Sequence, residues 1–161
     1  MIKVREYLPT DLKQMAGIWN EVVDDGIAFP QEEELTLDGA GAFFGSQSCC
    51  GVAEENGEIL GLYILHPNNV GRCGHIANAS YAVRSDIRGK GIGELLVRDC
   101  IEKCAQHGFR ILQFNAVVST NTSALRLYKK LGFTQLGVIP KGFRKKDGSY
   151  EDIIPHYITI E

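Results

Sequence analysis

The apolar positions in the first half of the chain follow two periods, one typical of strands and one typical of helices. Alternation, or a continuous apolar run of about four to eight residues, indicates a strand, whereas apolar residues spaced three and four apart indicate one face of a helix. These periods predict a strand at 2–7, helices at 12–23 and 37–44, and strands at 49–55, 59–66 and 75–83. Asn56-Gly57 joins two of these strands, and this dipeptide favours a tight hairpin because it accepts positive φ angles.

The second half of the chain alternates helices with strands. Its predicted elements are a helix at 91–107, a strand at 111–118, a helix at 121–131, and strands at 134–139 and 153–160 joined by a basic loop at 141–149. Gly108 and Gly132 stand where the two helices are expected to end. Pro155 falls inside the last strand, which places that strand at an edge or at a bulge. The order of elements predicts one mixed α/β (α+β) domain over residues 1–161, with hairpins early and β-α-β-α-β late.

Composition and charge narrow the class of protein. The chain has 161 residues, 44% of them hydrophobic and 23% charged, which is ordinary for one globular domain with a real core. The net charge of −3 argues against nucleic acid as a partner, because neutralising phosphates requires a cationic surface. No stretch approaches the roughly 20 apolar residues of a membrane helix, and the N-terminus lacks a signal-peptide pattern. We therefore expect a cytoplasmic protein with no membrane partner.

The five cysteines are expected to be structural. An odd number of cysteines in an intracellular context argues against a disulfide framework. Cys100 and Cys104 fall on the apolar face of the helix at 91–107 and are predicted to be small core residues. Cys73 and His75 have His66 nearby, but no second ligand pair at a zinc spacing accompanies them, so no metal is expected.

The candidate chemistry begins at a glycine-rich turn, residues 83–93, between a predicted strand and a predicted helix. Free backbone N–H groups at the start of a helix form a site for phosphate. A P-loop requires Ser or Thr after Gly-Lys, where this chain has Gly91, and the dinucleotide fingerprint requires a glycine where Glu94 stands. A third pattern, Arg/Gln-x-x-Gly-x-Gly/Ala, fits at every position: Arg88, Gly89, Lys90, Gly91, Ile92 and Gly93.

A second motif, residues 121–133, opens another helix after another strand. Together, residues 83–93 and 121–133 resemble the GCN5-related N-acetyltransferase (GNAT) family, and the order of elements extends the resemblance from residue 2 to residue 160. Residues 142–144 and 147–152 are also similar to members that acetylate small amines, including phosphinothricin-type acetyltransferases. The resemblance implies a central, mixed but mostly antiparallel sheet of six to seven strands with about four flanking helices. It also implies that the fourth and fifth strands splay apart.

The resemblance further implies that acetyl-CoA, the acetyl donor, binds in the gap between the splayed strands. The backbone of Tyr81, Ala82 and Val83 is expected to hydrogen-bond the pantetheine arm, and residues 88–93 are expected to hold the diphosphate. Asn121 is expected to contact the cofactor from the start of the next helix. A strand N–H near Val83 is expected to stabilise the oxyanion that develops on the thioester carbonyl.

Tyr128 occupies the position where many family members place a general acid, and it is the one catalytic residue that we predict. A phenol with an unperturbed pKa of about 10 is protonated at neutral pH and can protonate the leaving thiolate. The alternative role of Tyr128 is a packed aromatic side chain. The amine also needs a base, but the fourth strand has no carboxylate and Asn115 cannot act as one. Deprotonation through water is expected, with five side chains as weaker candidates: Asp24, Asp25, Glu54, Glu55 and His75.

These expectations describe an N-acetyltransferase (EC 2.3.1 type) that transfers an acetyl group directly to the primary amine of a small molecule, either amino-acid-like or an amine antimetabolite. Two alternatives are a protein or peptide N-acetyltransferase and a non-catalytic acyl-CoA-binding regulatory module. Acceptor recognition is expected from residues 24–30, 37–44 and 141–149, in a monomer or homodimer. The cations of the last segment bind a carboxylate or the CoA 3′-phosphate, or form a solvated charged surface: Lys141, Arg144, Lys145 and Lys146.

Overall fold

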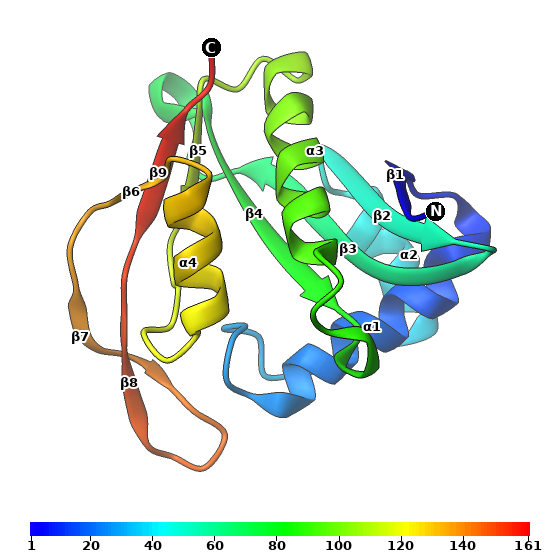
Figure 1. Ribbon diagram of the computed structural model, residues 1–161, viewed down its shortest axis with the longest axis horizontal. Helices are drawn as coiled ribbons and strands as arrows, with labels where there is room; N and C mark the ends of the chain where they lie inside the picture. The colour runs from blue at the N-terminus through cyan, green and yellow to red at the C-terminus, as the bar shows by residue number, and fades with distance from the viewer.

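A computed structural model describes the chain from Met1 to Glu161 (Figure 1). Its α-helices are α1 (Leu12–Asp25), α2 (Leu37–Gly45), α3 (Ile92–Gln106) and α4 (Thr122–Lys130). Its strands are β1 (Lys3–Glu6), β2 (Cys49–Glu55), β3 (Glu58–Pro67), β4 (Ile76–Val83), β5 (Ile111–Phe114), β6 (Thr134–Gln135), β7 (Ile139–Arg144), β8 (Tyr150–Ile153) and β9 (His156–Thr159). The longest helix, α3, has 15 residues, and none of the helices combines the length and the apolar character needed to span a membrane.

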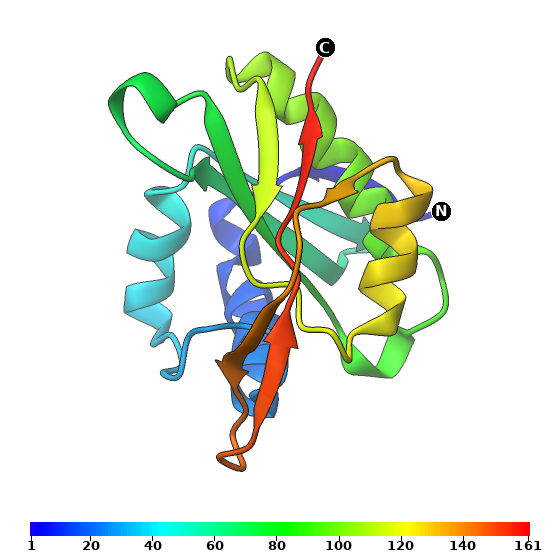
Figure 2. The ribbon, with the colours of Figure 1, turned by 90° about the vertical axis from the view of Figure 1, so that its left-hand side faces the viewer.

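Seven strands form the central sheet in the order β1-β2-β3-β4-β5-β9-β6, and β7 and β8 form a separate two-stranded sheet. Neighbours in the central sheet run antiparallel except β4 and β5, which run parallel and are joined by the crossover helix α3. Helices α1 and α2 cover one face of the sheet, and α3 and α4 lie on the other (Figures 1 and 2). This arrangement confirms the mixed, mostly antiparallel sheet with four flanking helices that the resemblance implied.

Two hydrophobic cores lie on opposite faces of the central sheet. Successive residues of β3 alternate between them, because side chains of a strand point to opposite faces. Leu62 and Ile64 pack with α1 and α2, whereas Tyr63 and Leu65 pack with α3, and all four are almost completely buried. Strand β3 therefore has a continuous apolar sequence, which is typical of a strand covered on both faces.

Local signals in both halves of the chain are confirmed. Helix α1 ends at Gly26, which has a left-handed φ of 64°. Asn56 and Gly57 have φ angles of 54° and 82° in the turn between β2 and β3, as the tight-hairpin prediction requires. Cys100 and Cys104 are fully buried core residues. Each of these features depends on a short stretch of sequence.

The prediction for the C-terminal region was wrong in one important respect. Residues 141–149 do not form a simple loop, because most of them belong to the hairpin β7–β8, which projects from the central sheet (Figure 2). Only Phe143 is buried in β7, so the sequence shows no alternation of apolar and polar residues there. The strand is also irregular at Lys141, which has a φ of 55° and donates its backbone N–H to the Asp152 carboxylate at 2.9 Å.

Three predicted strands also differ in extent, and the first is the expected strand 134–139, of which only Thr134–Gln135 forms β6 while Ile139 begins β7. Strand β5 ends at Phe114 rather than at residue 118, and the expected strand 153–160 is divided, with Ile153 in β8 and β9 beginning after Pro155. Proline has no backbone N–H to donate to a ladder, so the break lies where the sequence already indicated an irregularity. The shorter β5 matters for function, because it leaves β4 without a neighbour over its second half.

Candidate functional site

Strands β4 and β5 pair over three residues only and then separate. The last pair is Asn78 with Gln113, after which β4 continues to Val83 while β5 stops at Phe114. The edge of β4 that faces β5 therefore has no strand partner from Ala79 onward. A hollow of about 180 Å³, here called the central hollow, lies in this gap between the two strands and the start of α4. The splaying implied by the resemblance is thus present at the predicted strands.

The glycine-rich turn lies at the end of β4 and leads into α3. Gly89 and Gly91 have φ angles of 83° and 73°, and the space where a Cβ would stand on either residue is open. Gly91 is the N-cap of α3, and no side chain caps the free N–H groups of this helix. Because such N–H groups attract anions, the turn and the helix start together form a surface that suits an anion.

The charged side chains beside the turn differ in their availability. Arg84 is paired with Asp86 at 2.6 Å, whereas Arg88 and Lys90 form no ion pair. Glu94, in the first turn of α3, is engaged by Lys130 at 2.6 Å and by Arg98, and these two cations hold its pKa below the usual range. Two free cations therefore remain next to the uncapped helix start.

Helix α4 forms the other wall of a cleft of about 440 Å³, here called the helix cleft. Asn121 caps α4 by accepting the backbone N–H of Ala124 at 3.3 Å, and its side chain also lines the cleft. Arg88 and Gly93 face it across the opening, and Val83 lies at its base on β4. The structure thus brings residues 83–93 and the start of α4, which are well separated in sequence, to one cleft.

Tyr128 lies where the helix cleft meets the central hollow and lines both. Its ring packs on Phe114, Phe133 and His156, with centroid distances of 4.6, 5.3 and 5.5 Å, and only 9% of the residue is exposed. Burial raises the pKa of Tyr128, so the hydroxyl stays protonated over a wider pH range than an exposed phenol. The aromatic packing and a general-acid role are compatible, because the packing fixes the ring beside the hollow.

At Tyr81 and Ala82, backbone groups rather than polar side-chain groups face the gap between β4 and β5. The Tyr81 hydroxyl is buried against Cys100 without a hydrogen-bond partner, and burial raises the pKa of this phenol well above its ordinary value. The Ala82 side chain is 1% exposed and packs on the α1 side of the sheet. Any ligand along this part of β4 therefore meets main-chain N–H and C=O groups and apolar surface.

No carboxylate or histidine lines the central hollow. Asn115 lines it, and its amide is held by Asn68 at 2.7 Å and by Gln113 at 3.0 Å. Of the five weak candidates for a base, Glu54, Glu55 and His75 line none of the three hollows described here. Asp25 lines the helix cleft, and Asp24 lines the third hollow.

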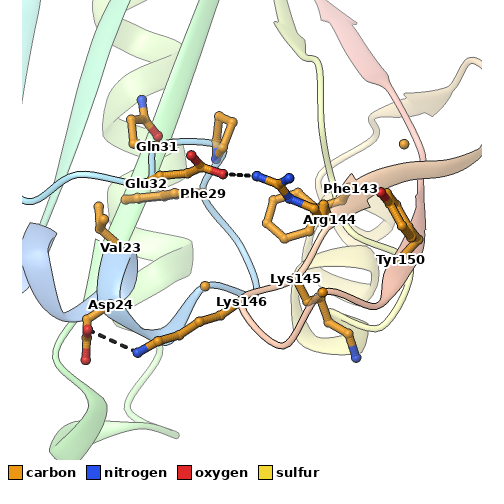
Figure 3. Close-up of a pocket in the computed structure, with 14 residues that line it drawn as sticks. Val23, Asp24, Phe29, Gln31, Glu32, Phe143, Arg144, Lys145, Lys146 and Tyr150 are labelled. Carbon is orange, nitrogen blue, oxygen red and sulfur yellow. Dashed lines mark hydrogen bonds and ion pairs between the residues drawn. The ribbon is translucent and has the colours of Figure 1, made fainter.

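The third hollow has a volume of about 780 Å³, the largest of the three described here, and is called the hairpin cavity (Figure 3). It lies between the α1–α2 loop and the hairpin β7–β8. Most of its lining comes from residues 24–30 and 141–149, two of the segments from which acceptor recognition was expected, although the second forms a hairpin rather than a simple loop. The loop residues Phe29 and Pro30 line both the hairpin cavity and the central hollow. The three hollows therefore adjoin, from the uncapped start of α3, past Tyr128, to the hairpin.

Comparison with known proteins gives the family of this fold. A model of the acetyltransferase (GNAT) family matches residues 15–133 of the chain. The structure of a GCN5-related N-acetyltransferase from Kribbella flavida is 32% identical, with a TM-score of 0.90 over 98% of this chain and 97% of that chain.

Two relatives are similar in sequence. N-acetyltransferase aca1 from Schizosaccharomyces pombe is 36% identical over 100 residues, which cover 62% of this chain and 47% of that protein, so the match spans less than half of the yeast protein. The L-methionine sulfoximine/L-methionine sulfone acetyltransferase of Pseudomonas aeruginosa is 28% identical over 146 residues, covering 86% of this chain and 83% of that protein.

Proposed function

Because this chain belongs to the acetyltransferase (GNAT) family, whose members are N-acetyltransferases, we propose that it transfers the acetyl group of acetyl-CoA directly to the primary amine of a small molecule. The observation that supports this proposal most is the unpaired edge of β4, which runs from the anion-binding turn to the hollow beside Tyr128. These features suit a long ligand, with its anionic end at the turn, its amide-containing arm along β4 and its reactive terminus in the hollow beside Tyr128.

The chain's own groups match the parts of acetyl-CoA. The N–H groups of residues 88–93 and the start of α3 bind the diphosphate, with Arg88 and Lys90 supplying full positive charges. The backbone of Tyr81, Ala82 and Val83 binds the pantetheine arm in the manner of an added strand. Asn121 lines the cleft beside the arm while it caps α4.

The bound donor supplies a thioester, whose carbonyl accepts the amine and whose sulfur leaves as a thiolate. A backbone N–H of β4 near Val83 stabilises the negative charge that develops on the carbonyl oxygen. Tyr128 donates its hydroxyl proton to the leaving sulfur, so that CoA departs as a neutral thiol. The tyrosinate then recovers a proton that originates from the attacking amine.

The amine loses its proton to water rather than to a side chain of the central hollow. The aromatic and amide groups that line this hollow include no carboxylate or imidazole. Asn115, fixed by two amide neighbours, hydrogen-bonds a water molecule beside the amine but cannot itself accept the proton. The rate of acetyl transfer should therefore rise with pH as the acceptor amine loses its proton. The apparent pKa of the pH–rate profile should match the pKa of the amine and change when a different amine is used.

Two features support a small-molecule acceptor. The hairpin cavity, between the α1–α2 loop and the hairpin, has a volume of about 780 Å³, which is within the range of small-molecule pockets. The Pseudomonas aeruginosa relative acts on L-methionine sulfoximine and L-methionine sulfone by name, and the alignment with it covers most of both chains. A wide groove that admits a peptide would have favoured a protein acceptor instead.

The test is a free-thiol assay of CoA release across amino acids, polyamines, aminoglycosides and peptides. We expect CoA release with at least one class of small amine and a matching acetylated product in the mass spectrum. Binding of acetyl-CoA with no release across the whole panel would instead support a non-catalytic acyl-CoA-binding module.

A further inference from the structure

The charged side chains that line the hairpin cavity have a net positive charge, whereas the whole chain is negatively charged. The lining of the cavity includes three cations and two anions, although the chain as a whole has a net charge of −3: Arg144, Lys145, Lys146, Asp24 and Glu32. These groups come from the hairpin on one side and from α1 and the loop that follows it on the other (Figure 3). An excess of positive charge disfavours polycationic acceptors such as polyamines and favours an acceptor with an anionic group.

The three cations differ in how far they are committed to other partners. Lys145 pairs with Glu151 of the same hairpin at 3.2 Å, and Lys146 pairs with Asp24 at 3.2 Å. The Arg144 guanidinium reaches across the cavity and donates one N–H to Glu32, which leaves most of its five donors free (Figure 3). Arg144 is therefore the cation with the greatest spare capacity for a ligand.

The Arg144–Glu32 contact is easily exchanged for a ligand. The two side chains are 58% and 73% exposed, and ion pairs this exposed add little to stability. Arginine binds a carboxylate through two parallel hydrogen bonds, a geometry that the single contact with Glu32 does not use. Resting on the proposed acetyl transfer, we propose that Arg144 binds a carboxylate of the acceptor, in place of Glu32.

The cavity also predicts where the carboxylate lies relative to the amine. Phe29, fixed against Trp19 with a centroid distance of 4.5 Å, lines both the hairpin cavity and the central hollow. Phe143 and Tyr150 add aromatic surface on the hairpin side. The amine is acetylated beside Tyr128 in the central hollow, so the carboxylate at Arg144 belongs to the opposite end of the acceptor, with an apolar segment between them along Phe29.

The experiment compares ω-amino acids with their primary amides. Glycine, β-alanine, 4-aminobutyrate and 6-aminohexanoate present one amine and one carboxylate at increasing separation, and each amide keeps the shape but removes the charge. CoA release gives kcat/KM for every compound, and ligand-observed NMR gives binding without turnover. We expect the acids to be preferred over their amides by about tenfold at the best chain length, the size of one charge-assisted contact.

Three variants assign this preference to Arg144. Arg144→Gln should remove the preference for acids, with acetyl-CoA affinity unchanged. Glu32→Gln removes the competing carboxylate, so it should lower the KM for the acids by a few fold and leave the amides unaffected. Lys145→Gln is the matched control, because it removes the same charge from the adjacent residue, whose ammonium is paired with Glu151. It should lower the acid preference far less than Arg144→Gln, through the overall charge of the cavity alone.

The outcomes separate this inference from the proposed function. CoA release from amides and acids alike overturns the carboxylate site and leaves the acetyl transfer standing. An equal loss of preference in Arg144→Gln and Lys145→Gln also overturns it, because the effect would then come from the overall charge of the hairpin. NMR binding that favours acids and depends on Arg144, without any CoA release, supports the carboxylate site and counts only against acetyl transfer.

Discussion

The two ends of the candidate site are built in different ways. The end around the glycine-rich turn depends on short sequence segments, in which two glycines with left-handed φ lead into a helix that no side chain caps. The end around the hairpin cavity depends on segments more than a hundred residues apart, such as Asp24 with Lys146 and Glu32 with Arg144. A local feature presents the backbone, which every member of a family can use in the same way, whereas a long-range assembly presents side chains that can differ with the acceptor.

The largest effect is expected at the turn. Gly91→Glu places a side chain at a φ of 73° and a carboxylate at the proposed diphosphate site, so acetyl-CoA binding should be abolished in a calorimetric titration. Gly108→Glu is the matched control, since Gly108 has a φ of 79° and lies beyond the opposite end of α3. It should lose about 1–2 kcal/mol of stability through the same strain but keep its affinity. Equal affinities in the two variants would contradict the diphosphate assignment.

Tyr128→Phe is expected to have the next largest effect. Removal of the hydroxyl should lower kcat by about 100-fold, the range of general acid catalysis, and leave the Kd of acetyl-CoA unchanged. Because burial raises the pKa of Tyr128, the hydroxyl should stay protonated up to about pH 10 or above. The wild-type rate should therefore show no decrease from ionisation of Tyr128 in that range.

Tyr81→Phe is the control for Tyr128→Phe. Tyr81 lines the same two hollows, but its hydroxyl is buried against Cys100 without a partner. The Tyr81→Phe variant should retain the wild-type kcat. A wild-type kcat in Tyr128→Phe would exclude Tyr128 from the mechanism.

Phe143→Ala should damage the hairpin end alone. Phe143 is 6% exposed and packs with Val118 and Ile153, and truncating such a side chain costs about 3–5 kcal/mol of packing. The hairpin should then open locally, so the acceptor KM should rise about tenfold. The rate of amide hydrogen exchange in β7 and β8 should also rise, and the affinity for acetyl-CoA should not change. Ile139→Ala, half exposed on the same strand, is the control. A parallel loss of acetyl-CoA affinity would show that the two ends are not independent.

Lys146→Gln should have the smallest effect. The side chains of Lys146 and Asp24 are each about two-thirds exposed. The backbone N–H of residue 146 also donates to the Gly26 carbonyl at 3.1 Å, and this hydrogen bond is kept in the variant. The acceptor KM should change by no more than about twofold, and 1 M salt should reduce the difference from wild type further. A larger change that persists at high salt would mean that this pair, rather than the core around Phe143, holds the hairpin in place.

The success of the sequence prediction follows the same division between local and long-range features. The elements of the first half and the glycine-rich turn between β4 and α3 were correctly located, because periodicity, the Asn56-Gly57 turn and the glycine pattern act over a few residues, whereas the binding of the cofactor at this turn stays a prediction. The hairpin was missed because β7 buries only Phe143 and is irregular at Lys141, so no alternation marked it as a strand, although Asp147-Gly148 is a turn signal. Asn121 caps α4, and its contact with the cofactor stays a prediction.

The sequence by itself determined the family and the central sheet with its four helices, and it located the glycine-rich turn between a strand and a helix. The tertiary structure alone decided that β5 stops early enough to free the edge of β4, that no carboxylate or histidine lines the central hollow, and that Arg144 reaches Glu32 across a cavity. The physical reason is that backbone conformation and helix starts depend on nearest neighbours in the chain, whereas a pocket depends on which distant side chains the packed sheet brings together.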